Sequence, residues 1–269
     1  MSKKSKSSSG VWQSLFAPLA IILAFIAAYL IFTRVLGNPV NFEGGNNKGH
    51  PLQGNLIGLM YKGGVIVPVL ITIVITLIIF TVERWITLTR VKGKSRLNAF
   101  VANLQHMLAE DRIEDAIVAC DKQKGSLANV MKAGLTRYRA LENDTELEKD
   151  QKITSMKQAL EEATALELPV LQRNMVMLST IASISVLIGL IGTVIGMIRA
   201  FAALAQSGAP DALALSTGIS EALVNTAFGI TGSTLAIIFF NMFSSRIDSY
   251  VFQIDEAGFS IAQSFAAKH

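Results

Sequence analysis

Four long apolar runs without a charged side chain constrain this chain more than any other feature. A membrane-spanning helix needs about 20 apolar residues, and in lipid a helix satisfies all of its own backbone hydrogen bonds. We therefore predict an all-α membrane protein with four transmembrane helices. The runs are 15–32 (LFAPLAIILAFIAAYLIF), 63–82 (GGVIVPVLITIVITLIIFTV), 175–198 (MVMLSTIASISVLIGLIGTVIGMI) and 222–243 (ALVNTAFGITGSTLAIIFFNMF), the last with an expected start near Leu213.

The first run has a cleaved signal peptide as its alternative reading. Its basic front, MSKKSK, fits either reading. However, its apolar core is longer than the roughly 7–15 residues of a signal peptide, and no small-x-small cleavage site follows it. We predict a retained helix, peripheral because it is apolar on all faces.

Composition supports a membrane protein and excludes several other classes. Charged residues make up 16% of the chain, and the mean hydropathy is +0.45, whereas soluble domains carry about 25% charged residues. The basic residues do not gather as nucleic-acid binding requires. Cys120 is the only cysteine, so no internal disulfide is possible, and we expect it to be a small buried apolar residue. No metal or other cofactor is expected.

Topology follows from the distribution of Lys and Arg. The N-terminus carries Lys3, Lys4 and Lys6, and residues 83–174 carry fifteen Lys and Arg residues. The two short connections hold only three basic residues, Lys48, Lys62 and Arg199. Both termini and the middle segment are therefore predicted to be cytoplasmic.

The middle segment has helical periodicity. One predicted helix has Ser95 as its N-cap and a continuous apolar face, and another has Thr145 as its cap. Pro169 is expected to bend the chain before the third span. The apolar face of the first helix consists of Leu97, Phe100, Val101, Leu104, Met107 and Leu108.

The third span, LIGLIGTVIGMIRAF, contains glycines at 189, 192 and 196 and a lone Thr193. The glycines recur every three or four residues and share a helix face, which favours a tight helix–helix seam in lipid. The Thr193 hydroxyl can bond the Gly189 carbonyl one turn back. By itself, therefore, this threonine indicates ordinary helix packing.

The fourth span places a carboxylate, Glu221, at least two turns inside an apolar stretch. An ionised carboxylate at that depth is costly and usually marks a functional route or a subunit contact. The alternative is a helix-end residue that reaches the headgroups. Asn225 lies one turn further along nearly the same face, which Gly218, Gly229 and Gly232 extend, whereas Thr226 lies about 140° away.

Together, LIGLIGTVIGMIRAF, GISEALVNTAFGI and FFNMF closely resemble the ExbB/TolQ/MotA proton-channel family, the ExbB branch in particular. VERW at the end of the second span and AIVACDKQKGSLANVMKAGL in the middle segment also look like that branch. The resemblance covers roughly residues 63–265.

The resemblance implies a homo-pentameric ring around a central pore that holds a dimer of a single-span ExbD/TolR-like partner. It implies a bacterial inner membrane location, proton flow through an aspartate of that partner, and transfer of motion to a TonB-like protein that spans the periplasm. The implied site residues are Thr193, Thr226 and Asn225 along the proton path, Glu221 as functional carboxylate or subunit contact, and Gly189, Gly192, Gly196, Gly218, Gly229 and Gly232 in helix packing.

The predicted segments combine the charge-based topology with the pore-lining roles that the resemblance implies. They are a basic cytoplasmic N-terminus (1–14), an extra transmembrane helix (15–36), an irregular periplasmic loop (37–62), a second transmembrane helix (63–82), a cytoplasmic helical domain (83–174), a pore-lining helix (175–205), a periplasmic turn (206–212), a second pore-lining helix (213–245) and a cytoplasmic C-terminal helix (246–269). The sequence departs from the family pattern in its extra first span, in lacking a proline at GSTLAIIFF and in having Asn225 beside Thr226.

Other functions remain as alternatives. A TolQ-like subunit would support envelope integrity, and a non-conducting scaffold would use the glycines for packing alone. A secondary transporter would show internal repeats and broken helices, and the sequence shows no sign of them. An enzyme would show a phosphate loop or a catalytic grouping of side chains, and the sequence shows neither. A MotA-like role is disfavoured because the middle segment is short.

Overall fold

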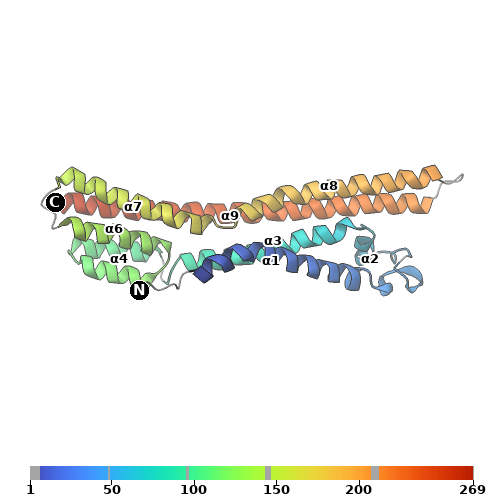
Figure 1. The fold of residues 1–269 in the computed structure, drawn as a ribbon, viewed down its shortest axis with the longest axis horizontal. Coiled ribbons are helices and arrows are strands. Elements are labelled where there is room, and N and C mark those ends of the chain that lie inside the picture. The colour runs from blue at the N-terminus through green and yellow to red at the C-terminus, as the bar shows by residue number, and fades with distance from the viewer. Residues whose placement is uncertain (1–6, 48, 95–96, 143–146, 207–211, 269) are drawn as a thin grey trace. The chain divides into compact units, whose positions relative to one another are not determined.

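The structure is a computed structural model that describes residues 7–47, 49–94, 97–142, 147–206 and 212–268. It divides into two compact units, which are treated separately below (Figure 1). The membrane unit consists of Met1–Thr81 and Val176–Phe240. The helical unit consists of Val82–Met175 and Asn241–His269.

The membrane unit is built from long helices. Within the described residues, four helical stretches are long and apolar enough to cross a membrane, as predicted, and their most apolar parts have mean hydropathies between 1.7 and 2.6. Most large apolar side chains on them are exposed, among them Val176, Leu187 and Leu223. Such a surface suits a hydrocarbon solvent rather than water. The helices are α1 (Ser7–Leu30), extended by a π-helical turn at Ile31–Leu36, α2 (Leu56–Tyr61), the first part of α3 (Ile66–Val91), most of α8 (Met175–Gln206) and the first part of α9 (Ala212–Lys268).

The connection between α1 and α3 is more ordered than an irregular loop. It contains two 3₁₀ turns, Pro39–Asn41 and Glu43–Gly45, in addition to α2. The Tyr61 ring stacks on Phe32 at 4.7 Å and meets Phe42 edge-on at 5.4 Å, measured between ring centroids. These aromatic contacts fold the connection back on the end of α1.

The helical unit contains α4 (Leu97–Ala109), α5 (Ile113–Gln123), α6 (Ser126–Glu142), α7 (Lys149–Gln172) and the end of α9. Tyr138 of α6 and Phe265 of α9 meet edge-to-face at 4.7 Å in its buried core. Cys120 is buried as predicted, and burial raises the pKa of its thiol to about 12. Of the apolar face predicted for α4, Leu97, Phe100, Leu104 and Leu108 are buried, while Val101 and Met107 are half-buried.

Helix boundaries differ in places from those suggested by the sequence. The proposed caps Ser95 and Thr145 lie outside the described residues, and α7 begins at Lys149, where the Gln151 side chain accepts the Glu148 N–H at 3.1 Å. The last helix, α9, continues unbroken past residue 245 because no proline interrupts its hydrogen-bond ladder.

Candidate functional site

The two long helices α8 and α9 pack backbone to backbone. They run antiparallel, since residues near 189 meet residues near 229 while Gly196 meets Gly218. A Cβ added at Gly189 would lie 2.9 Å from the Asn225 carbonyl oxygen and 3.0 Å from the Gly229 Cα. One added at Gly196 would lie 2.7 Å from the Gly218 carbonyl oxygen. Only glycine permits this approach, and side by side the two helices form a continuous seam (Figure 1).

Two serines form hydrogen bonds between α8 and α9 along the seam. The buried Ser185 hydroxyl donates to the Gly229 carbonyl at 3.0 Å, and the Ser233 hydroxyl donates to the Ala182 carbonyl at 2.6 Å. Gly232 makes room for Ser185, because a Cβ there would collide with the Ser185 Oγ. Sequence reasoning missed both serines, although each lies in an apolar span where a hydroxyl needs an explanation.

Glu221 forms an ion pair inside the membrane unit. Glu221 is only 4% exposed, and its Oε1 accepts a hydrogen bond from the Arg199 guanidinium Nη1 at 2.6 Å. The Arg199 side chain is half exposed, so the pair joins a buried carboxylate to a cation near the surface. The sequence indicated a topological role for Arg199 but did not identify it as the partner of Glu221. The pairing explains how a carboxylate is accommodated in an apolar helix.

Gly64 completes the surroundings of this carboxylate. The glycine has φ +77°, and a Cβ at this position would collide with the Glu221 Oε1. Glycine is therefore required here for two reasons: it adopts the left-handed backbone conformation, and it lets the backbone approach a charged group closely. The chain just before α3 is thereby held against α9.

Asn225 makes a second link between the start of α3 and α9. Its side chain is fully buried, and its Nδ2 donates to the Gly63 carbonyl at 2.9 Å. The same side chain packs on Gly192, where an added Cβ would lie 2.6 Å from the Asn225 Cγ. Among the residues that the structure describes, the Asn225 Oδ1 has no hydrogen-bond partner. Asn225 thus lies with Glu221 in the interior of the membrane unit.

The two threonines lie apart from that interior cluster. The Thr193 hydroxyl donates to the Leu190 carbonyl at 2.6 Å, three residues back, rather than to Gly189. The Thr226 hydroxyl donates to the Ala222 carbonyl at 3.3 Å. Both side chains are half-buried, and within the described residues neither bonds to Glu221. Each oxygen retains the capacity to accept a hydrogen bond from water or from a partner.

Thr193 also lines a shallow depression on α8. The depression has a volume of about 470 Å³, and its other lining residues are Val194, Met197, Ile198 and Phe201. A single hydroxyl in an apolar surface is suited to contact with another apolar helix that carries one polar group.

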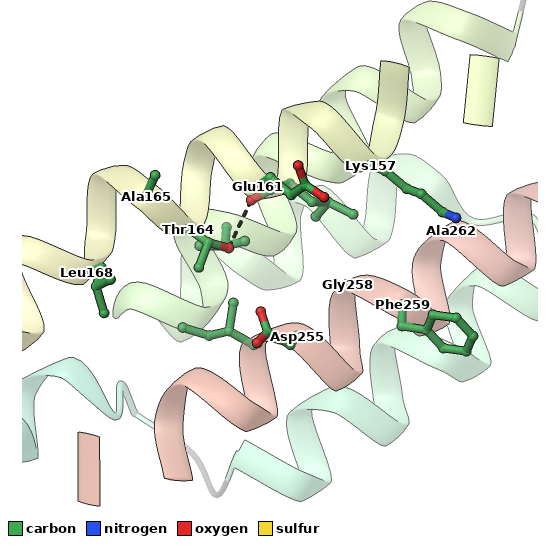
Figure 2. A pocket seen from close by; sticks show the side chains of 12 residues that line it. Lys157, Glu161, Thr164, Ala165, Leu168, Asp255, Gly258, Phe259 and Ala262 are labelled. Carbon is green, nitrogen blue, oxygen red and sulfur yellow. Dashed lines mark hydrogen bonds between the residues drawn. The ribbon is translucent and has the colours of Figure 1, made fainter. Parts of the chain in front are cut away.

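The helical unit has a separate groove of about 540 Å³ between α6, α7 and α9 (Figure 2). Its floor is mainly apolar, while Lys157 and Glu161 of α7 and Asp255 of α9 supply charges at its sides. The Thr164 hydroxyl in this groove donates to the Leu160 carbonyl at 2.9 Å. This lining resembles a hydrophobic contact surface rather than a reactive site.

Comparison with known proteins agrees with this architecture. Residues 122–256, about half of the chain, match the MotA/TolQ/ExbB proton channel family. The chain is 40% identical over 94 residues to the putative biopolymer transport protein ExbB-like 3 of Synechocystis, covering 34% of this chain and 45% of that protein. It is 38% identical over 73 residues to the biopolymer transport protein ExbB of Salmonella typhimurium, covering 27% and 30%.

A longer and weaker similarity connects the chain to another branch. It is 24% identical over 185 residues to the Tol-Pal system protein TolQ of Pseudomonas aeruginosa, covering 66% of this chain and 80% of that protein. The matches to the two ExbB-named relatives span less than half of their lengths. The family match, the four membrane-length helices and the glycine seam together lead to one conclusion: this chain belongs to the MotA/TolQ/ExbB proton channel family.

Proposed function

We propose that the chain is the ring-forming subunit of an ExbB-like, proton-driven motor in the bacterial inner membrane. In this proposal a homo-pentamer surrounds an ExbD-like dimer and couples proton flow to TonB-dependent outer-membrane transport. The observation that carries the proposal is the arrangement of α8 and α9. Their glycine seam and the Glu221 carboxylate that pairs with Arg199 are buried, whereas Thr193 and Thr226 remain partly exposed.

The proposed proton carrier belongs to the partner. Within 175–205 and 213–245 the only acid is Glu221, which pairs with Arg199. Threonine hydroxyls do not titrate near neutral pH, but they order water and exchange hydrogen bonds. A partner carboxylate passing Thr193 and Thr226 would supply the titrating group. One charge that crosses 100 mV gains about 2.3 kcal/mol, enough to bias a ring with nearly equal positions.

Asn225 and Glu221 have a supporting role in this proposal. Asn225 fixes Gly63 at the start of α3, and Glu221 joins α8 to α9 through Arg199. Both contacts lie at the end of the seam that is proposed to face the periplasm. They would keep α8 and α9 in register while the outer face of the pair contacts the partner.

A TolQ-like subunit for envelope integrity is the second candidate. The similarity to TolQ covers 80% of that relative, more than either ExbB match described above. The segment KQKGSLANVMKAGL favours ExbB at the level of sequence. A non-conducting scaffold is the third candidate, because the seam alone accounts for the glycines.

The first experiment identifies the partner. The chain is purified from native membranes in mild detergent and analysed by native mass spectrometry. A pentamer that carries a small single-span protein with an intramembrane aspartate supports the motor, and the sequence of that protein separates the ExbB and TolQ tasks. A monomer, or an oligomer without such a partner, would support the scaffold.

A second experiment tests the threonines in vesicles that contain the chain and its partner. Thr226→Val keeps the side-chain volume and removes the hydroxyl, so proton flux should fall about tenfold for a lost interaction of about 1.4 kcal/mol. Thr231→Val is the matched control, since the exposed Thr231 also bonds its own helix, to the Ala227 carbonyl at 2.7 Å. Equal flux in both variants would refute a pore role for Thr226.

The same design applies to Thr193. Thr193→Val should lower flux with assembly intact, and Thr180→Val is its control because Thr180 also bonds its own helix, to the Val176 carbonyl at 2.7 Å. If Thr193→Val dissociates the oligomer instead, the residue belongs to a packing surface.

A further inference from the structure

An ion pair between the buried Arg84 and the partly exposed Glu83 lies near the end of α3, away from the proposed pore residues. Arg84 is fully buried, and its guanidinium binds the carboxylate of its neighbour Glu83 through two bonds. The Nε atom meets the Glu83 Oε2 at 2.8 Å, and the Nη2 atom meets the Glu83 Oε1 at 2.7 Å. This two-bond geometry is the most directional form that an ion pair takes in proteins.

Two further hydrogen bonds of the pair reach the joint between α7 and α8, and a third stays within α3. The Arg84 Nη1 donates to the Leu171 carbonyl at 3.3 Å. The Glu83 carboxylate also accepts from the Asn174 Nδ2 at 3.1 Å and from the Thr87 hydroxyl at 3.0 Å. All five residues belong to the helical unit, so the arrangement is internal to it.

The joint itself has little support from its own backbone. The helix α7 ends at Gln172, and α8 begins at Met175. Arg173 has extended ψ (+139°), and Asn174 has φ +58°, the left-handed conformation that asparagine tolerates at helix ends. The Leu171 carbonyl is among the last four of α7, which lack a partner within their own helix. The guanidinium of Arg84 satisfies that carbonyl.

We propose that Glu83 and Arg84 are positioning residues that set the α7–α8 joint and thereby couple the cytoplasmic helices to pore-lining α8. The coupling of these helices to α8 rests on the proposed function, whereas the role of the ion pair in setting the geometry of the joint does not. A buried ion pair adds little stability compared with apolar residues of the same size. We infer that the pair instead fixes the orientation of the joint, because it bonds both the last turn of α7 and the side chain of Asn174.

The test measures the joint directly. Spin labels are placed at Gln158 of α7 and Ser183 of α8, both exposed, in a Cys120→Ser background, and their distance distribution is measured in the assembled protein. The distribution should be narrow in the parent and should broaden in Glu83→Gln and in Arg84→Lys, which keeps the charge but loses the two-bond geometry. Glu114→Gln, which removes an exposed ion pair with Arg139, is the control and should leave it unchanged.

Proton flux supplies the second readout. Glu83→Gln and Arg84→Lys should lower flux about tenfold while native mass spectrometry still finds the oligomer with its partner. Asn174→Gly covers the case in which the charge variants fail to fold, because glycine adopts positive φ without strain and both charged side chains stay in place while the bond to Glu83 is lost. This variant should also broaden the distribution.

The two proposals fail differently. Narrow distributions in all three variants would overturn the positioning role. Broadened distance distributions with unchanged proton flux would overturn the coupling to the pore, although the ion pair would still set the joint. A parent that conducts no protons would count against the motor, and the spin-label distances would still decide whether the pair sets the joint.

Discussion

The contact between Gly232 and Ser185 gives a sharp test of the α8–α9 seam. A Cβ at Gly232 would collide with the Ser185 Oγ but would stand 3.5 Å from the Ser185 Cβ, an ordinary contact. Gly232→Ala therefore forces the hydroxyl to rotate and to lose its 3.0 Å bond to the Gly229 carbonyl. Such a bond within a membrane contributes about 0.6 kcal/mol, and up to about 1.7 kcal/mol.

The magnitude depends on the background. Alanine in place of glycine within a helix gains about 0.5–1 kcal/mol, which roughly offsets the lost bond, so Gly232→Ala alone should change stability by less than about 1.2 kcal/mol. Ser185→Ala alone should cost about 0.6–1.7 kcal/mol. In the Ser185→Ala background the collision is gone, so Gly232→Ala should stabilise by about 0.5–1 kcal/mol. The predicted coupling is therefore about 1 kcal/mol.

The assay is equilibrium unfolding in mixed micelles with increasing dodecyl sulfate, followed by far-UV circular dichroism. Gly189→Ala is the matched comparison, because its Cβ would meet the Asn225 carbonyl and the Gly229 Cα, which no side-chain rotation relieves. It should cost about 1–3 kcal/mol in either background. An equal effect of Gly232→Ala with and without the Ser185 hydroxyl would refute the predicted seam geometry.

Four predictions concern the helical unit. Because burial raises the Cys120 thiol pKa from 9.0 to about 12, iodoacetamide at pH 8 should alkylate the native chain about a thousandfold more slowly than the denatured chain; comparable rates would contradict that burial. The neutral thiol also stabilises the fold below about pH 9, so the free energy of unfolding should fall as pH rises from 9.0 to about 12. Phe265→Ala, which removes the ring packed on Tyr138, should lower the free energy of unfolding by about 3–5 kcal/mol in a denaturant titration, and a loss below 1 kcal/mol would mean that the ring is not in the core. Arg139→Ala, which breaks an exposed pair with Glu114, should change the same quantity by less than about 0.5 kcal/mol, and a larger loss would show that solvent does not screen this pair.

The membrane helices were predictable because lipid leaves few solutions for a backbone. Apolar length alone located the four spans, and small-residue spacing identified Gly189 and Gly196 as candidates for close packing. The partner of Glu221 was not predictable in the same way. Arg199 lies 22 residues away on another helix, and only the packing of α8 on α9 brings the two together.

The remaining features depend on details that no sequence period records. The Thr193 hydroxyl chooses the carbonyl three residues back over the one four back, a difference of one rotamer. The connection between α1 and α3 has no periodicity, and its order comes from Tyr61 meeting Phe32 and Phe42 across a turn. The joint at Asn174 depends on the Glu83 side chain of α3, 91 residues earlier in the chain.

The backbone contact between α8 and α9 limits which mutations the gene can accept. Where Gly189 and Gly229 meet, every missense change adds at least one carbon, and the nearest atoms are backbone atoms of the opposite helix. Neutral drift therefore has no small step available at these codons, in contrast to exposed apolar positions such as Leu223, where one apolar residue can replace another. Inherited variation in α8 and α9 should therefore be more frequent at exposed apolar positions than along the line where the two helices meet.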